Sequence, residues 1–128
     1  MTIRLTSVMV DDQEKALKFY TDILGFVKKT EVPMGEHKWL TVVSPEDQAG
    51  PELLLEPMGF APAKTYQAAL FAAGIPLTAF SVTDVDKEYA RLVAAGVAFS
   101  MPPTTMGPAR LAVLNDTCGN YIQLMQLL

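Results

Sequence analysis

The chain contains nearly the same phrase twice, LTSVMVDDQEKALKFY at residues 5–20 and LTAFSVTDVDKEYARL at residues 77–92. In each copy, alternating apolar residues lead to an aspartate, Asp12 or Asp84, and then to apolar residues at helical spacing. Alternation with period two predicts a β-strand, and an aspartate at this point is a favoured N-cap of the following helix. The repetition therefore predicts two similar halves, each beginning with a strand that leads into a helix.

The repeat extends along most of the chain. A shift of 72 positions also aligns Gly35 with Gly107 and Lys38 with Arg110. The predicted strands are residues 3–10, 26–32, 37–43 and 51–56 in the first half and 76–82, 97–101, 109–114 and 120–127 in the second; the helices end near residues 24 and 95. This pattern predicts an α+β fold: two tandem β-α-β-β-β modules, residues 1–56 and 76–128, form one domain over 1–128. A connecting helix is expected within 57–75, and a curved mixed sheet around a cleft.

Composition excludes several classes of protein. A length of 128 residues suits one domain, and a net charge of -4 argues against a nucleic-acid partner, which favours a basic surface. No apolar run reaches the roughly 18 residues of a membrane span, so no membrane partner is expected. The single cysteine, Cys118, cannot form an internal disulfide, which favours a reducing cytoplasm.

Alternation within the strands separates two faces in each half. One parity should lie under the helices: Val8, Val10, Phe80, Val82, Ile122 and Leu124, met by a stripe of Tyr89, Leu92 and Val93 on the second helix. The opposite parity mixes apolar and polar groups: Leu5, Ser7, Glu52, Leu54, Leu77, Ala79, Tyr121 and Gln123. No helix within its own half is left to cover this second face, so we expect the two such faces to enclose one shared cleft.

Three segments carry a resemblance to a known family: VMVDDQEKALKFYTDILGF (residues 8–26), GPELLLEP (50–57) and NDTCGNYIQLMQ (115–126). The last is similar to a D-x-x-G-N-x-x-E-L ending. The chain resembles the vicinal oxygen chelate superfamily, which includes glyoxalase I, bleomycin- and fosfomycin-resistance proteins and extradiol dioxygenases. The resemblance covers nearly the whole chain and implies paired β-α-β-β-β modules. It implies no single activity, because one fold of this kind hosts many chemistries.

Metal-dependent members of that family hold the ion with four residues, usually His and Glu. Carried over by the resemblance, these positions fall at Leu5, Glu52, Leu77 and Gln123. Leucine has no atom that donates to a metal, and one carboxylate with one amide leaves most of the coordination sphere to water. We therefore expect no metal ligands and no cofactor, and keep a divalent metal only within the alternative hypothesis below.

The candidate ligand-binding residues all belong to the predicted cleft: Leu5, Ser7, Trp39, Glu52, Leu54, Leu77, Ala79, Tyr121 and Gln123. Glu52 is also the candidate catalytic residue, either as an acid/base or as a hydrogen-bond partner of Gln123. The only histidine, His37, is expected to be an exposed strand-end residue rather than a cleft residue. Cys118 is expected to fill a turn rather than act as a nucleophile.

The leading hypothesis for function is a small organic molecule held in an apolar cleft and sequestered, as in bleomycin-resistance proteins. The alternative is a lyase, isomerase or dioxygenase that uses Glu52, with or without a divalent metal. A third hypothesis is a partner-binding subunit whose cleft is vestigial. A homodimer is expected in each case, because symmetric dimers are the commonest assemblies of small domains.

Overall fold

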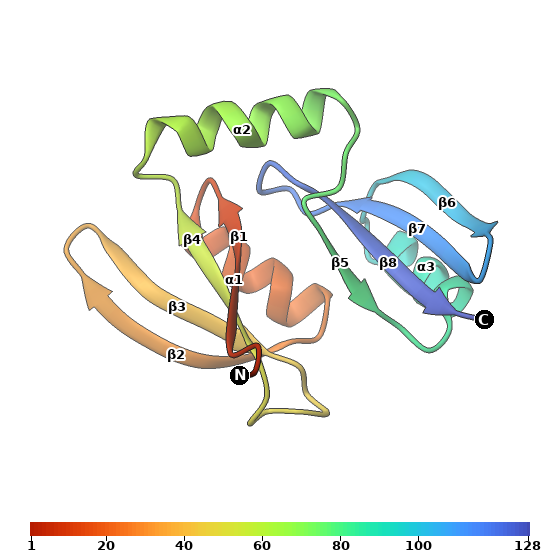
Figure 1. Ribbon diagram of the computed structural model, residues 1–128, viewed down its shortest axis with the longest axis horizontal. Helices are drawn as coiled ribbons and strands as arrows, with labels where there is room; N and C mark the ends of the chain where they lie inside the picture. Colours follow the sequence, from red (N-terminus) through yellow and green to blue (C-terminus); the bar gives the residue numbers. More distant parts are fainter. The chain divides into compact units, whose positions relative to one another are not determined.

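A computed structural model describes residues 1–128, which form two compact units, Met1–Lys64 and Thr65–Leu128. The first unit contains β1 (Leu5–Val10), α1 (Gln13–Lys18), its π-helical continuation η1 (Phe19–Ile23), β2 (Val27–Met34), β3 (His37–Val43) and β4 (Glu52–Pro57). The second contains β5 (Thr78–Ser81), α3 (Val85–Ala94), β6 (Phe99–Met106), β7 (Ala109–Asn115) and β8 (Tyr121–Leu127). Helix α2 (Ala61–Ala72) carries the chain from one unit into the other (Figure 1). The predicted α+β fold with β-α-β-β-β order in both halves is confirmed.

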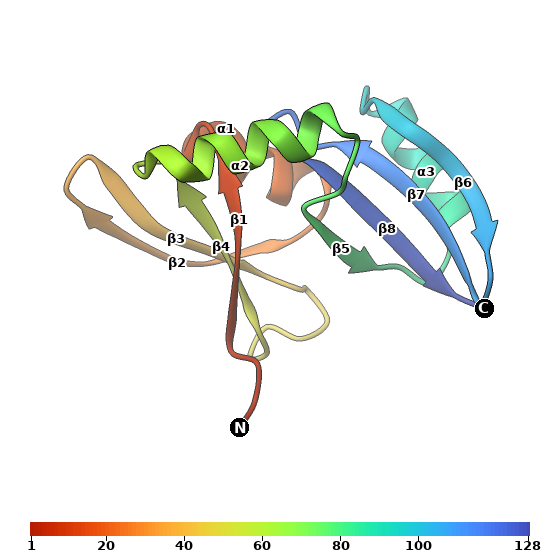
Figure 2. The same cartoon turned by 45° about the horizontal axis from the view of Figure 1, so that its top comes forward.

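Each unit has one four-stranded mixed sheet, in the order β1-β4-β3-β2 or β5-β8-β7-β6. The first strand of each unit runs parallel to the last, and the other pairs are antiparallel. Figure 2 shows α3 lying against one face of the second sheet. None of the helices is both long enough and apolar enough to cross a bilayer.

The helix ends follow the sequence prediction. A side-chain oxygen of Asp12 accepts from the backbone N–H of Lys15, and Asp84 accepts from Lys87, each at 3.1 Å. These are N-caps at equivalent positions of the repeat. The glycines that close the helices, at positions 25 and 96, have φ values of 92° and 91°, the left-handed conformation expected after a helix.

Burial confirms the predicted division into two faces for most of the named residues, but Phe80 and Val82 are only half-buried. Val8 and Val10 have no exposed surface, and neither does Ile122, whereas Leu5 and Ser7 on the opposite parity are exposed. The prediction for Val93 is wrong, because 47% of its surface is exposed. The buried side of α3 is centred on its first and eighth residues, positions 85 and 92, and Val93 projects beyond the edge of that stripe.

The sixth strand is longer than the sequence suggested. The prediction ended it at residue 101, before Pro102 and Pro103, but β6 continues through both prolines to Met106. Proline lacks the N–H that a central strand must donate, yet β6 lies at the sheet edge and its pairing with β7 is interrupted by register shifts near the prolines. An edge strand tolerates prolines that would end a central one.

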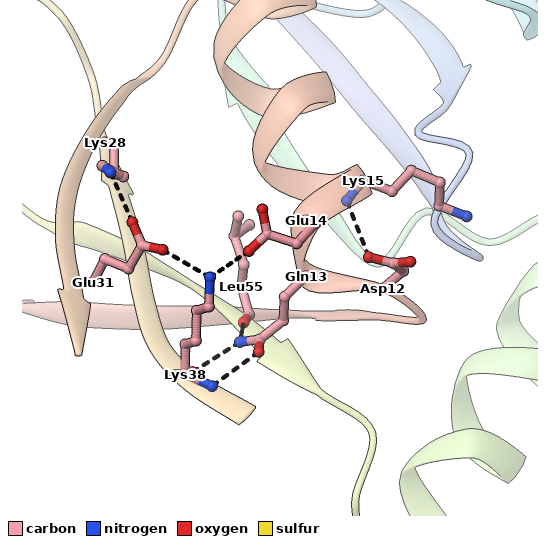
Figure 3. A network of polar contacts seen from close by, with 8 residues as sticks. All are labelled: Asp12, Gln13, Glu14, Lys15, Lys28, Glu31, Lys38 and Leu55. Atoms are coloured by element: carbon pink, nitrogen blue, oxygen red, sulfur yellow. Dashed lines mark hydrogen bonds and ion pairs between the residues drawn. The ribbon is translucent and has the colours of Figure 1, made fainter. Parts of the chain in front are cut away.

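The two halves differ where the third and fourth strands meet. In the second unit β7 and β8 pair over their whole lengths, but β3 and β4 pair only between residues 41–42 and 53–54 and then diverge (Figure 1). The side chain of Gln13 fills the opening (Figure 3): its amide nitrogen donates to the carbonyls of Lys38 and Leu55, each at 2.8 Å, and its oxygen accepts from the Lys38 N–H at 3.0 Å. Gln13 therefore supplies side-chain hydrogen bonds at the point where the strands separate.

A chain of ion pairs crosses the same edge of the first unit. The Lys38 ammonium contacts Glu14 on α1 and lies 2.8 Å from Glu31 on β2, which in turn receives Lys28 at 2.7 Å (Figure 3). Hydrogen bonds from Lys28 and Lys38, reinforced by their charges, lower the pKa of Glu31 from 4.5 to about 2. The same carboxylates raise the pKa of Lys38. These contacts fasten α1 to the β2–β3 hairpin.

The second unit has an equivalent contact, because Arg110 binds Asp86 on α3 through two hydrogen bonds of 2.8 Å. Arg110 and Asp86 lie 72 residues after Lys38 and Glu14, so the helix-to-hairpin ion pair is part of the repeat. Arg110 lowers the pKa of Asp86 by hydrogen bonding and by its charge.

The turn between β7 and β8 holds the N-terminal end of β8 in place. The buried Asp116 carboxylate accepts from the backbone N–H groups of Cys118 and Asn120 and from the Asn120 amide, at 2.8 to 3.0 Å. From α2, Gln67 donates to the Cys118 carbonyl and to Asn120. Gly119 has a φ of 99°, and a Cβ at this position would lie 2.7 Å from the Gln67 side-chain oxygen. The turn therefore requires glycine both for its backbone and for its packing.

We predict that Gly119→Ala is more destabilising than Gly96→Ala. Both residues have φ near 90°, but only Gly119 faces Gln67, while a Cβ at Gly96 meets nothing within 4 Å. Displacing Gln67 breaks two buried hydrogen bonds, so the difference in the free energy of unfolding should be roughly 1–3 kcal/mol. Urea melts of both variants measure it. Equal losses would show that the packing against Gln67 contributes nothing.

A second prediction concerns pH. Because the folded pKa of Glu31 is lowered, its ion pairs contribute stability above about pH 4.5 and lose that contribution as the pH falls toward about 2. Thermal melts of the parent and of Glu31→Gln across this range should converge at the acidic end. Glu46→Gln, at an exposed loop position, controls for the loss of one charge. A constant gap between the parent and Glu31→Gln at every pH would contradict the account.

Candidate functional site

We call the sheet face opposite α1 or α3 the distal face of each unit. In the first unit the strand register places seven of its residues together: Leu5, Ser7, Thr30, Trp39, Thr41, Glu52 and Leu54. Leu5 and Trp39 keep 41% and 37% of their surface exposed, although Thr41 and Leu54 are buried. The five candidate residues of this half, Leu5, Ser7, Trp39, Glu52 and Leu54, therefore share one face of one sheet. It combines apolar contact area with a single oriented carboxylate.

The Glu52 carboxylate is held in place by threonines. One of its oxygens, Oε1, accepts a hydrogen bond of 2.6 Å from the hydroxyl of the buried Thr41 and a longer one of 3.4 Å from Thr30. The other oxygen, Oε2, receives no hydrogen bond from the chain, and Glu52 is half-buried. The arrangement fixes the carboxylate and leaves one oxygen available to a ligand. The sequence reasoning missed both threonines; only Thr41 had a signal in the sequence, its shared parity with Trp39 on the same strand.

The metal-ligand positions implied by the resemblance do not form a donor set. Leu5 lies directly opposite Glu52, so a hydrocarbon side chain stands beside the one carboxylate. In the second unit Ala79 lies opposite Gln123, and Leu77 precedes β5 and donates its N–H to the Tyr121 carbonyl. Neither unit contains a group of three or more His, Cys, Asp or Glu side chains placed to hold an ion. The residues present do not fit the family's divalent metal.

The second unit's distal face contains Leu77, Ala79, Tyr121 and Gln123, the four candidates of that half. Phe71 from α2, the connecting helix that the prediction placed outside both halves, stacks on Tyr121 with ring centroids 4.3 Å apart and planes 2° apart. Such a stack occupies aromatic area that a ligand would otherwise contact. Ala79 is exposed, and Leu77 and Gln123 are half-buried. Ala79, Leu77 and Gln123 therefore keep surface for a ligand, whereas Tyr121 is already partly engaged.

Cys118 and His37, the other two residues weighed for a chemical role, occupy the structural positions expected of them. Cys118 is completely buried in the β7–β8 turn, which confirms the structural interpretation. His37 is exposed and begins β3, as expected of a strand-end histidine.

His37 also lines a pocket that the sequence reasoning missed. This pocket of about 550 Å³ lies in the first unit, beside the opening between β3 and β4 that Gln13 fills. It is lined by Val10, Asp11, Asp12, Gln13, Glu14, Glu36, His37, Lys38, Pro57, Met58 and Lys64. No sequence signal marked it, because the separation of two paired strands has no motif. Its charges are mixed and several are engaged in ion pairs, so it makes a weaker case for a ligand site than the distal face.

The chain is similar in sequence and in structure to several known proteins. The Bacillus subtilis (strain 168) protein YurT is 54% identical over 126 residues, which cover 98% of this chain and 99% of YurT. Among solved structures, UcmS2 has a TM-score of 0.84 at 27% identity and covers 98% of this chain and 97% of its own. TnmS3, an antibiotic binding protein from Streptomyces sp. CB03234, has a TM-score of 0.77 at 31% identity, over 100% of this chain and 97% of its own.

Residues 2–124 match the Glyoxalase/Bleomycin resistance protein/Dioxygenase superfamily, nearly the whole chain. With two β-α-β-β-β units and solved structures of similar fold in agreement, the chain belongs to the Glyoxalase/Bleomycin resistance protein/Dioxygenase superfamily.

Proposed function

We propose that this protein binds a small organic molecule on the distal face of its first unit and sequesters it without converting it. The observation that carries the proposal is the first unit's distal face, where exposed Leu5 and Trp39 accompany the oriented Glu52 carboxylate. Ligand sites in proteins are mostly apolar, with a few polar groups that fix the ligand's orientation. This face has that composition.

The likeness to TnmS3 supports the same proposal. TnmS3 is described as an antibiotic binding protein, and it shares 31% of its residues with this chain over nearly full length. A protein with this fold can therefore serve as a binding protein. We extend that role to this chain, with a homodimer in the cytoplasm as the proposed form.

The chemistry of the donor set favours binding over metal-dependent catalysis. A Lewis-acid site needs several nitrogen, oxygen or sulfur ligands around one ion, and Leu5 and Leu77 supply none. The remaining route to catalysis is proton transfer by Glu52. Its open oxygen, Oε2, suits either a proton transfer or a hydrogen bond to a ligand, and the experiment below separates the two.

We predict that a bound ligand is recovered unchanged. Trp39 is the only tryptophan and lies on the proposed surface, so quenching of its fluorescence reports binding directly. A panel of small-molecule antibiotics would be titrated, and each one that binds would be incubated with excess protein and recovered by denaturation for mass spectrometry. The proposal expects the original mass and a stoichiometric limit. Turnover into a product, slowed about 100-fold or more in Glu52→Gln, would instead establish the enzyme hypothesis.

We also predict that the purified protein carries no stoichiometric divalent metal. Protein prepared without chelators would be analysed for its metal content, and its melting temperature measured with added Ni²⁺, Zn²⁺, Mn²⁺ and Fe²⁺. Only a nonspecific shift is expected, since ligand-linked stabilisation requires a site in the folded state. About one ion per chain, or a large rise in melting temperature with one metal, would overturn the sequestration proposal in favour of a metalloenzyme.

A further inference from the structure

The charges on the distal faces restrict the chemistry of the ligand. In the first unit the strand residues that point to this face include two carboxylates, Glu52 and Glu56, and no lysine or arginine. In the second unit the corresponding residues of β5, β7 and β8 carry no charged side chain at all. An anionic ligand would find no lysine or arginine among the strand residues of either face.

The basic residues of the strands point elsewhere. Lys38 and Arg110 bind acidic residues on the helices of their own units, and Lys28 binds Glu31. Lys29 donates to a carbonyl of the β3–β4 loop, at residue 48. Arg4, just before β1, donates to the carbonyl of Ala49. The remaining basic residues, Lys15, Lys18, Lys64, Lys87 and Arg91, lie on α1, α2 and α3.

The Glu52 carboxylate is ordered in a way that suits a hydrogen bond from a positively charged group. Thr41 and Thr30 donate to Oε1, so the carboxylate is ordered before a ligand arrives and its Oε2 lone pairs remain available. A half-buried carboxylate without a basic partner lacks the charge compensation that a lysine or arginine would give. A ligand ammonium that donates a hydrogen bond to Oε2 would supply it, and such charge-assisted bonds are stronger than neutral ones.

The position of Trp39 also favours a cationic ligand. It lies two residues before Thr41 on the same face of β3, so it neighbours the hydroxyl that orients Glu52. Tryptophan is the aromatic side chain that attracts cations most strongly through its ring face. A carboxylate and an indole that flank one threonine suit an organic cation with an apolar body.

We propose that the ligand is an organic cation, an aromatic or aliphatic amine whose ammonium group donates to Glu52 Oε2 while its apolar part packs on Trp39 and Leu5. This inference rests on the proposed binding function and names its ligand class. The net charge of -4 favours the approach of such a molecule.

Three probes of nearly equal shape test the inference: 2-phenylethylammonium, 2-phenylethanol and 3-phenylpropionate, which are cationic, neutral and anionic at neutral pH. Each would be titrated against the full chain by Trp39 fluorescence, with nuclear magnetic resonance to detect weak binding. The cation should bind about tenfold or more tightly than the other two, and less tightly as salt is raised. Neutral or anionic probes that bind equally well would overturn the inference and leave the proposed function standing. If none of the three perturbs Trp39 or its neighbours, both fall.

The matched variants are Glu52→Gln and Glu46→Gln, each of which changes the net charge from -4 to -3. Glu46 lies in the exposed β3–β4 loop, away from the face. Glu52→Gln should weaken cation binding about tenfold and leave the neutral probe unaffected, because an uncharged amide replaces the carboxylate. Glu46→Gln should do neither. Equal effects of the two variants would show that the preference for the cationic probe comes from net charge alone, and would overturn the assigned role of Glu52. Should Glu52→Gln fail to fold, the three-probe comparison on the parent chain still decides.

Discussion

A four-stranded sheet has two faces, and each unit of this chain has one helix that follows its first strand and packs against the sheet. In the first unit α1 takes the face of Val8 and Val10, and it is tied to the hairpin by Lys38 and Glu14. A shift of register by one residue would exchange the two faces, so burial of one parity fixes the other as surface. The candidate site follows from this constraint, because the residues that α1 leaves uncovered include Leu5, Trp39 and the carboxylate of Glu52.

The two units agree closely in the residues that support the fold and differ elsewhere. The N-caps, the left-handed glycines and the helix-to-hairpin ion pairs recur at the same positions of both units. The differences lie in strand pairing: Gln13 bridges β3 and β4 where they separate, whereas at the equivalent place in the second unit Gln126 accepts from the backbone N–H of Val85. Phe71 covers Tyr121 in the second unit only. The two units therefore have similar frameworks, and their distal faces differ in charge and in the side chains that cover them.

Sequence reasoning predicted the features that depend on local chemistry and period. Alternation assigned Val8 and Ile122 to buried faces, and Asp12 and Asp84 to helix starts, because both signals are written in neighbouring residues. It failed where distant segments decide: β6 passes through Pro102 because it is an edge strand, and Gln13 bonds to strands 25 and 42 residues away. Likewise the threonines that orient Glu52 come from separate strands. Candidate residues within each half could be grouped from parity, but their hydrogen-bond partners could not.

We propose that the ligand is held on the distal face of the first unit rather than in the pocket beside Gln13. A crystal structure of the protein with a ligand that quenches Trp39 fluorescence would decide between these two locations. We expect a molecule whose apolar part contacts Leu5 and Trp39 and whose polar group lies within hydrogen-bond distance of Glu52 Oε2. A ligand seated instead among His37, Met58 and Lys64, with the distal face unchanged, would contradict it.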